Sequence, residues 1–171
     1  MLKVYTIDTT GIRNGSYTGA STITAGSTAS GTITANNGYV APRLSSDINF
    51  ANVTGQYTRT SETVGTITLS NPIDSANNTV YIETECPQKY NITVNVTNGY
   101  SSAISATYII SGGTAMVIVV PNAGYKLPVR TAVITVTNAT ADFSEYTTNN
   151  GKINLSNPTD DVTISLTCLP A

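Results

Sequence analysis

Apolar and polar residues alternate along most of this chain, in short runs that are separated by turn residues. In residues 80–86, for example, Val80, Ile82 and Cys86 share one parity, while Glu83 and Glu85 share the other. A period of two is typical of β-strands with one face buried. Such runs, spaced by Gly, Asn or Pro, predict strands near residues 3–9, 19–24, 28–35, 47–52, 55–60, 65–70, 79–86, 89–96, 104–110, 114–121, 132–138, 142–146, 151–156 and 161–168.

The pattern occurs twice. When the chain is shifted by about 86 positions, residues 23–72 fall on residues 109–158 without a gap, and about 17 of 50 positions are identical. The shared residues are turn formers, as in the two Gly-Tyr-x-x-Pro elements, and the apolar members of alternating runs. A β module records its shape at such positions, so the repeat indicates a duplicated fold rather than a duplicated reaction centre.

The period near 85 predicts two domains, residues 1–87 and 88–171, each large enough for one core. About seven short strands per copy favour a sandwich or barrel, and an immunoglobulin-like β-sandwich is the leading choice. The first copy carries about four extra residues around Asp74 to Asn78, where a turn tolerates a change of length.

Composition narrows the possible partners. Charged residues make up 11% of the chain and the net charge is −2, so no nucleic-acid footprint is visible. No apolar run reaches the length of a membrane-spanning helix, and the N-terminal residues predict a strand rather than an export signal. We therefore expect no nucleic-acid partner and no insertion into a membrane.

Catalytic chemistry is not indicated either. The chain has no His, which excludes a Ser-His-Asp triad. Cys86 and Cys168 share parity with core positions of equivalent strands in separate domains, and this predicts buried free thiols. An intermolecular bridge is the alternative. We expect no catalytic residue, no metal site and no cofactor.

Three carboxylate pairs are the remaining candidates: Glu83 with Glu85, Asp160 with Asp161, and Asp142 with Glu145. Two carboxylates can bind calcium or act as acid and base. None of the pairs clearly recurs in the other copy. The favoured interpretation is therefore that the glutamates form the solvent face of an edge strand and the aspartates satisfy turn backbone.

The Gly-Tyr-x-x-Pro elements place Tyr39 and Tyr125 at equivalent loops. A tyrosine in such a loop can contact carbohydrate. More commonly it anchors the loop through its hydroxyl while Gly and Pro fix the turn.

The copies differ most in one strand. Ser30, Thr32 and Thr34 share the outer parity of the first copy, and Met116, Ile118 and Val120 replace them in the second; Val133 likewise replaces Asp47. Apolar residues on both faces indicate a strand that is covered twice or a contact surface. We take Met116, Ile118, Val120 and Val133 as a candidate docking face, with a central strand covered by a loop as the alternative.

Taken together, the Gly-rich turn before residues 28–35, the Gly-Tyr-x-x-Pro loop, Gly-x-Ile-x-Leu-Ser-Asn-Pro and the closing strand ending in Cys resemble tandem Ig-like repeats. Repeats of that kind occur in bacterial surface proteins and in bacteriophage capsid, head-fibre and tail proteins. The resemblance covers both halves of the chain and implies display or adhesion without naming a ligand.

The function expected from these features is a non-enzymatic virion protein, most simply a capsid decoration protein assembled in the host cytoplasm. It would dock through one domain onto other virion proteins or onto itself, and display the other domain, with host-surface glycans as a further partner. The alternative is an extracellular adhesin or carbohydrate-binding module at the cell surface.

Overall fold

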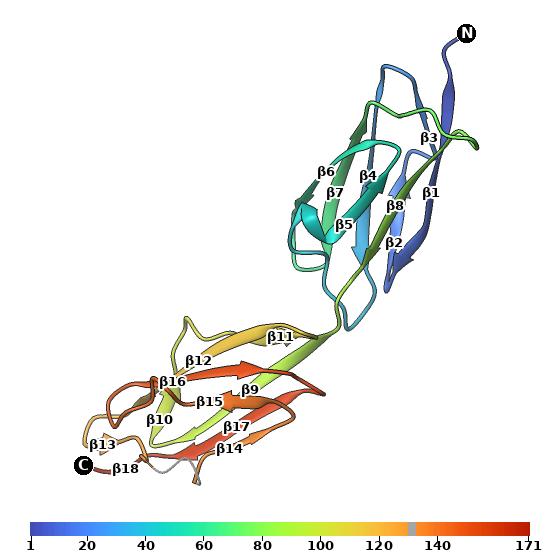
Figure 1. Ribbon diagram of the computed structural model, residues 1–171. Helices are drawn as coiled ribbons and strands as arrows, with labels where there is room; N and C mark the ends of the chain where they lie inside the picture. Colours follow the sequence, from blue (N-terminus) through green and yellow to red (C-terminus); the bar gives the residue numbers. More distant parts are fainter. Residues whose placement is uncertain (130–132) are drawn as a thin grey trace. The chain divides into compact units, whose positions relative to one another are not determined.

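β-Strands are the main secondary structure of this chain. The computed structural model describes residues 1–129 and 133–171, and these residues contain no α-helix. The described chain divides into two compact units, Met1–Gln88 (unit 1) and Lys89–Ala171 (unit 2), each drawn in Figure 1. The prediction of an all-β protein is confirmed.

Unit 1 contains two four-stranded sheets. One has the order β3-β1-β8-β5, formed by Thr22–Thr24, Val4–Arg13, Thr79–Glu85 and Ile48–Ala51. The other has the order β2-β4-β7-β6, formed by Gly15–Gly19, Thr28–Ala35, Val64–Ser70 and Thr54–Arg59. The first and last strands, β1 and β8, are parallel neighbours at the centre of their sheet, and the other pairs are antiparallel.

Unit 2 has the same strand order. One sheet is β11-β9-β17-β14, formed by Tyr108–Ile110, Lys89–Thr97, Val162–Thr167 and Thr135–Thr137. The other is β10-β12-β16-β15, formed by Gly99–Ser101, Thr114–Pro121, Gly151–Ser156 and Thr140–Asp142. Again the first and last long strands, β9 and β17, are parallel. A short pair, β13 (Tyr125–Lys126) with β18 (Leu169–Pro170), completes the unit.

Both sheets of a unit contribute to one hydrophobic core, which gives each unit the character of a β-sandwich. In unit 1 the buried residues include Ile7 and Ile82 from one sheet and Ile33 and Leu69 from the other. Unit 2 has its own cluster on the same plan. Alternation produces these faces directly: in β7 the residues Gly65, Ile67 and Leu69 are buried, and the threonines between them are exposed.

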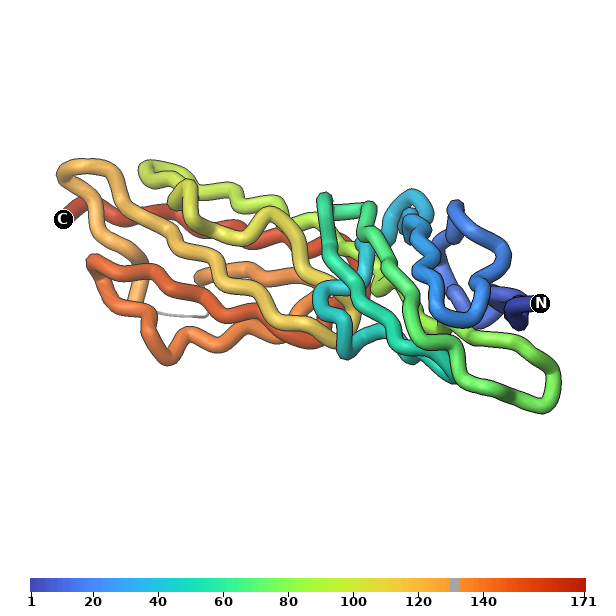
Figure 2. Tube along the Cα trace, turned by 90° about the horizontal axis from the view of Figure 1, so that it is seen from above, coloured from blue at the N-terminus to red at the C-terminus, as the bar shows by residue number. Residues whose placement is uncertain are grey.

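The turns repeat as closely as the strands. Asparagines adopt the left-handed backbone conformation at three equivalent pairs of turns: Asn14 (φ 56°) and Asn98 (φ 57°), Asn52 (62°) and Asn138 (61°), and Asn71 (50°) and Asn157 (50°). Asparagine tolerates this conformation better than most residues with a side chain. One connection differs between the units. In Figure 2 the longer β7–β8 connection of unit 1, coloured green, extends beyond the ends of its strands.

Several predicted strands need correction. Strand β2 and strand β10 were not predicted, and the segments 19–24 and 104–110 form only the shorter β3 and β11. The predicted strand 142–146 is wrong, since β15 ends at Asp142 and its carboxylate then accepts hydrogen bonds from Ser144 N and Oγ, which turns the chain. Of the predicted strand 132–138, β14 occupies Thr135–Thr137, and residue 132 lies outside the described residues.

Candidate functional site

The outer side of β12 carries the three central residues of the predicted docking face. Val117 and Val119 point into the core and are fully buried, whereas Met116, Ile118 and Val120 alternate with them and are partly exposed. The strand is therefore apolar on both faces, as its sequence indicates.

Strand β10, which the sequence did not predict, adds a fourth apolar residue to this side. Tyr100 lies opposite Val120 in the β10–β12 pairing, and its side chain is 55% exposed. We call Tyr100, Met116, Ile118 and Val120 the β12 face. To predict Tyr100 as part of this face, one would have to recognise Gly99–Ser101 as a strand. Three residues show too little alternation for that.

The residues that follow β10 continue along the same edge of β12 and form hydrogen bonds to it. Ser102 N and Ser105 Oγ donate hydrogen bonds to the carbonyl oxygen of Ile118, and Ala106 N donates to that of Met116. On the other side, Ile118 lies opposite Lys152 of β16 and Met116 lies opposite Asn154. The β12 face is thus a fixed part of a paired sheet, and polar residues border it.

The equivalent face of unit 1 is built from hydroxyls. Strand β4 presents Ser30, Thr32 and Thr34 at the places of Met116, Ile118 and Val120, and β2 presents Ser16 opposite Thr34 where unit 2 has Tyr100. The four apolar residues of the β12 face therefore occupy the places of four hydroxyl residues in the equivalent sheet of unit 1.

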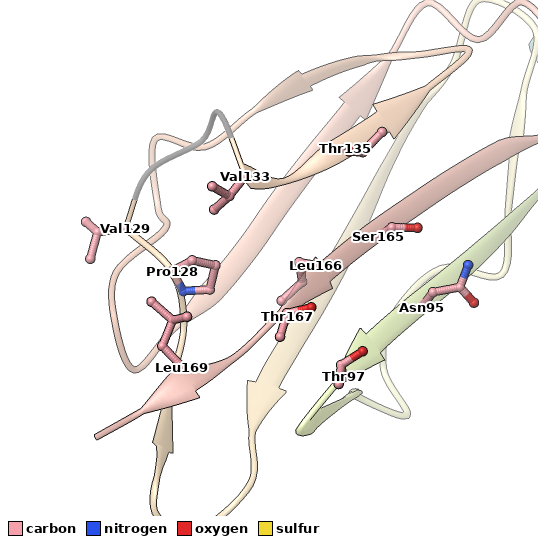
Figure 3. A pocket seen from close by; sticks show the side chains of 10 residues that line it. All are labelled: Asn95, Thr97, Pro128, Val129, Val133, Thr135, Ser165, Leu166, Thr167 and Leu169. Atoms are coloured by element: carbon pink, nitrogen blue, oxygen red, sulfur yellow. The ribbon is translucent and has the colours of Figure 1, made fainter.

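Val133, the fourth predicted docking residue, lies elsewhere. It precedes β14 on the other sheet of unit 2 and is 56% exposed. There it borders a groove of about 690 Å³, shown in Figure 3, whose rim also includes Pro128, Val129 and Leu169. The structure thus separates the predicted residues into a sheet face and a groove.

The two loop tyrosines hold the end of each unit through their backbone. Tyr39 forms a bridge with Gln88, and Tyr125 pairs with Pro170 in the β13–β18 ladder. Tyr39 packs against the core of unit 1, while Tyr125 is 36% exposed. The hydroxyl that anchors this loop in unit 1 belongs instead to buried Tyr57, which donates to the carbonyl oxygen of Pro42 at 2.9 Å.

Two of the carboxylate pairs satisfy turns or neighbouring side chains. Asp161 accepts a hydrogen bond from Asn91 N at 2.7 Å, and Asp160 accepts one from Asp161 N. The Asp142 carboxylate binds Ser144, and these hydrogen bonds lower its pKa, whereas Glu145 pairs with Lys152. Neither arrangement brings two carboxylates together on one ligand.

The glutamates of β8 lie on a solvent face, but β8 is a central strand rather than the predicted edge strand. Their carboxylates accept hydrogen bonds from side-chain amides, Glu83 from Asn49 at 2.8 Å and Glu85 from Asn14 at 3.3 Å. The glutamates are thus part of a polar surface network of unit 1.

The two cysteines are free and buried, and burial raises the pKa of both thiols. Across residues 1–129 and 133–171, no group of three or more His, Cys, Asp or Glu side chains is placed to hold a metal ion. Within the same residues, no helix has the length and apolar character needed to cross a membrane. Searches of protein-family models, curated proteins and solved structures gave no match to this chain.

Proposed function

We propose that this chain is a non-enzymatic structural protein of a bacteriophage particle. In this proposal it consists of two immunoglobulin-like modules that arose by duplication, decorates the capsid through unit 2 and displays unit 1. The chain would be made in the host cytoplasm and would act in the assembled virion.

The observation that carries the proposal is the contrast between the β12 face and its counterpart in unit 1. Two sheets with the same strand order and pairing carry Tyr100, Met116, Ile118 and Val120 in one case and only Ser and Thr in the other. Partly exposed apolar side chains on a paired sheet cost solvation free energy until a partner covers them. A docking unit and a displayed unit differ in this way.

The modular fold supports the same role. Equivalent strand orders and equivalent asparagine turns favour a duplicated module, and the sequence motifs resemble Ig-like repeats of phage and surface proteins. The placing of β1 beside β8, parallel and central, is a variation on the two-sheet immunoglobulin plan. The carboxylates occupied in turns and the absence of His from the sequence favour a non-enzymatic function.

The first test is to find the chain on a particle. Cryo-electron microscopy of the assembly with which it purifies, together with mass spectrometry of the intact particle, should show ordered copies with the β12 face against a neighbour. A soluble monomer that is absent from every particle would contradict the proposal and favour the alternative of an adhesin or carbohydrate-binding module.

A matched set of variants tests the face itself. Met116→Ser, Ile118→Thr and Val120→Thr together give unit 2 the residues of unit 1, and we expect attachment to be lost while unit 2 still folds. Val4→Thr, at an exposed strand position of unit 1, is the control and should attach normally. If the triple variant only unfolds unit 2, the residues of the β12 face serve the stability of the unit rather than docking.

A further inference from the structure

The floor of the groove in unit 2 is a set of polar side chains aligned across three strands. The strand register places Asn95 of β9, Ser165 of β17 and Thr135 of β14 side by side in one row. Thr97 and Thr167 form the next row along β9 and β17. Because neighbouring strands lie about 5 Å apart, these groups form a compact array of hydrogen-bond donors and acceptors.

These five side chains make no hydrogen bond to any other residue within the part of the chain that the structure describes. The equivalent surface of unit 1 is satisfied internally, because Asn49 donates to Glu83 and Asn14 donates to Glu85. Thr135, Ser165 and Thr167 stand where unit 1 has Asn49, Glu83 and Glu85. Unit 2 has therefore lost the internal partners of this surface and kept its capacity for hydrogen bonds.

The rim of the groove is apolar. Pro128, Val129, Val133 and Leu169 lie along one side of the floor in Figure 3, and the last three are large exposed apolar residues. At the places of Val129 and Val133 unit 1 has Arg43 and Asp47. Among the described residues, the groove lining contains no ionisable side chain, and the groove volume of about 690 Å³ lies within the usual range of small-ligand sites.

We infer that this groove is a binding site for a neutral saccharide. The ligand hydroxyls pair with the amide of Asn95 and with the Thr and Ser hydroxyls, and a C–H face of the sugar packs against Val129, Val133 and Leu169. We infer a neutral sugar because the described lining residues offer no charge to pair with an acidic sugar, which would lose hydration here. The inference concerns a different sheet from the β12 face and does not depend on the virion proposal.

The test uses the isotope-labelled full chain and nuclear magnetic resonance. Maltohexaose, cellohexaose and chitohexaose are titrated separately to about 10 mM, a range that detects weak binding. We expect at least one of them to shift the amide signals of β9, β14, β17 and residue 169, with saturation. Hexagalacturonate, the charged comparison, should leave these signals unchanged.

Two glutamate substitutions with the same chemistry separate the groove from the rest of its sheet. Ser165→Glu introduces the residue that unit 1 has at this place and should abolish the shifts. Thr93→Glu is its control, since Thr93 lies on the same face of β9 as Asn95 but outside the groove, and it should bind as the wild type does. Removing the rim with Leu169→Ser should weaken binding by about tenfold.

Circular dichroism and thermal unfolding establish that each variant folds. The inference is overturned if none of the three neutral oligosaccharides shifts the groove signals, if hexagalacturonate shifts them equally, or if Thr93→Glu weakens binding as much as Ser165→Glu does. Shifts that map to the β12 face would also overturn it.

Discussion

Unit 1 and unit 2 share their interior and their turns but not their surfaces. Leu69 and Leu155 are equivalent core residues with almost no exposure, and Asn71 and Asn157 turn the chain after them with the same φ of 50°. The outer faces differ at equivalent positions. One sheet of unit 2 has apolar residues where unit 1 has hydroxyls, and the other has uncharged residues where unit 1 has charges. The fold constrains the interior, so we expect differences in function on the faces that point outward.

The largest effects should come from the shared interior. Leu69→Ala and Leu155→Ala each remove a fully buried side chain, and each should lower the unfolding free energy of its own unit by about 2–5 kcal/mol. Ser70→Ala and Ser156→Ala, at neighbouring partly exposed positions, are the controls and should change little. Urea unfolding followed by residue-resolved resonance signals would show which unit melts. Equal destabilisation of both units by either leucine variant would contradict two independent cores.

Much of this interior could be predicted from the sequence, because alternation in runs such as residues 64–70 determines both the strand and its buried face. Turn residues in the two copies likewise predict the repeat. The short strands β2 and β10 could not be predicted, since three to five residues with Gly at the ends show little periodicity. These two segments are strands because they pair with β4 and β12.

The candidate site was predictable only in part. The apolar side of β12 could be predicted, because it follows from the pattern of eight consecutive residues. The groove joins Asn95, Val133 and Ser165, which are far apart in sequence and meet only through the parallel β9–β17 pairing and the β14–β17 pairing. A parallel pair of first and last strands leaves no local signal in the chain.

A smaller difference concerns the buried hydroxyls of two tyrosines, Tyr57 and Tyr146. The hydroxyl of Tyr57 donates to the Pro42 carbonyl, whereas the hydroxyl of Tyr146 is buried and has no partner among the described residues. Tyr57→Phe should therefore destabilise unit 1 by about 1–2 kcal/mol, because it leaves a buried carbonyl oxygen unsatisfied. Tyr146→Phe should be neutral or slightly stabilising. Thermal unfolding of the two variants makes this comparison, and an equal loss in both would contradict it.

The same tyrosines predict a response to alkali. Burial raises the pKa of both Tyr57 and Tyr146 from 10.0 to about 12. The folded chain then holds these protons after the unfolded chain has released them, so stability falls as the pH rises from about 10 to about 12. Each Phe variant should reduce this fall in its own unit. A fall that is unchanged by Tyr57→Phe and Tyr146→Phe would assign the alkaline sensitivity to other groups.

The smallest expected effect lies in the long β7–β8 connection that distinguishes unit 1. Asp74 in this connection pairs with Lys3 at 2.8 Å and accepts a hydrogen bond from the hydroxyl of Tyr5, and these two contacts lower the pKa of its carboxyl. A carboxyl whose pKa is lowered by folding stabilises the fold above its unfolded pKa, and this stabilisation is lost as the pH falls through the folded value.

Unit 1 should consequently show a weak loss of stability below about pH 4 that Asp74→Asn reduces. The effect is small because the pair is exposed to solvent, and added salt should reduce it further. Asp8→Asn is the comparison, since Asp8 also has a lowered pKa but binds only Thr10 within its own strand, so this variant should remove only the share of Asp8 and leave that of Asp74. Thermal unfolding against pH would decide the matter. If unit 1 of the Asp74→Asn variant loses as much stability in acid as the wild type does, the β7–β8 connection does not stabilise the N-terminal strand through Asp74.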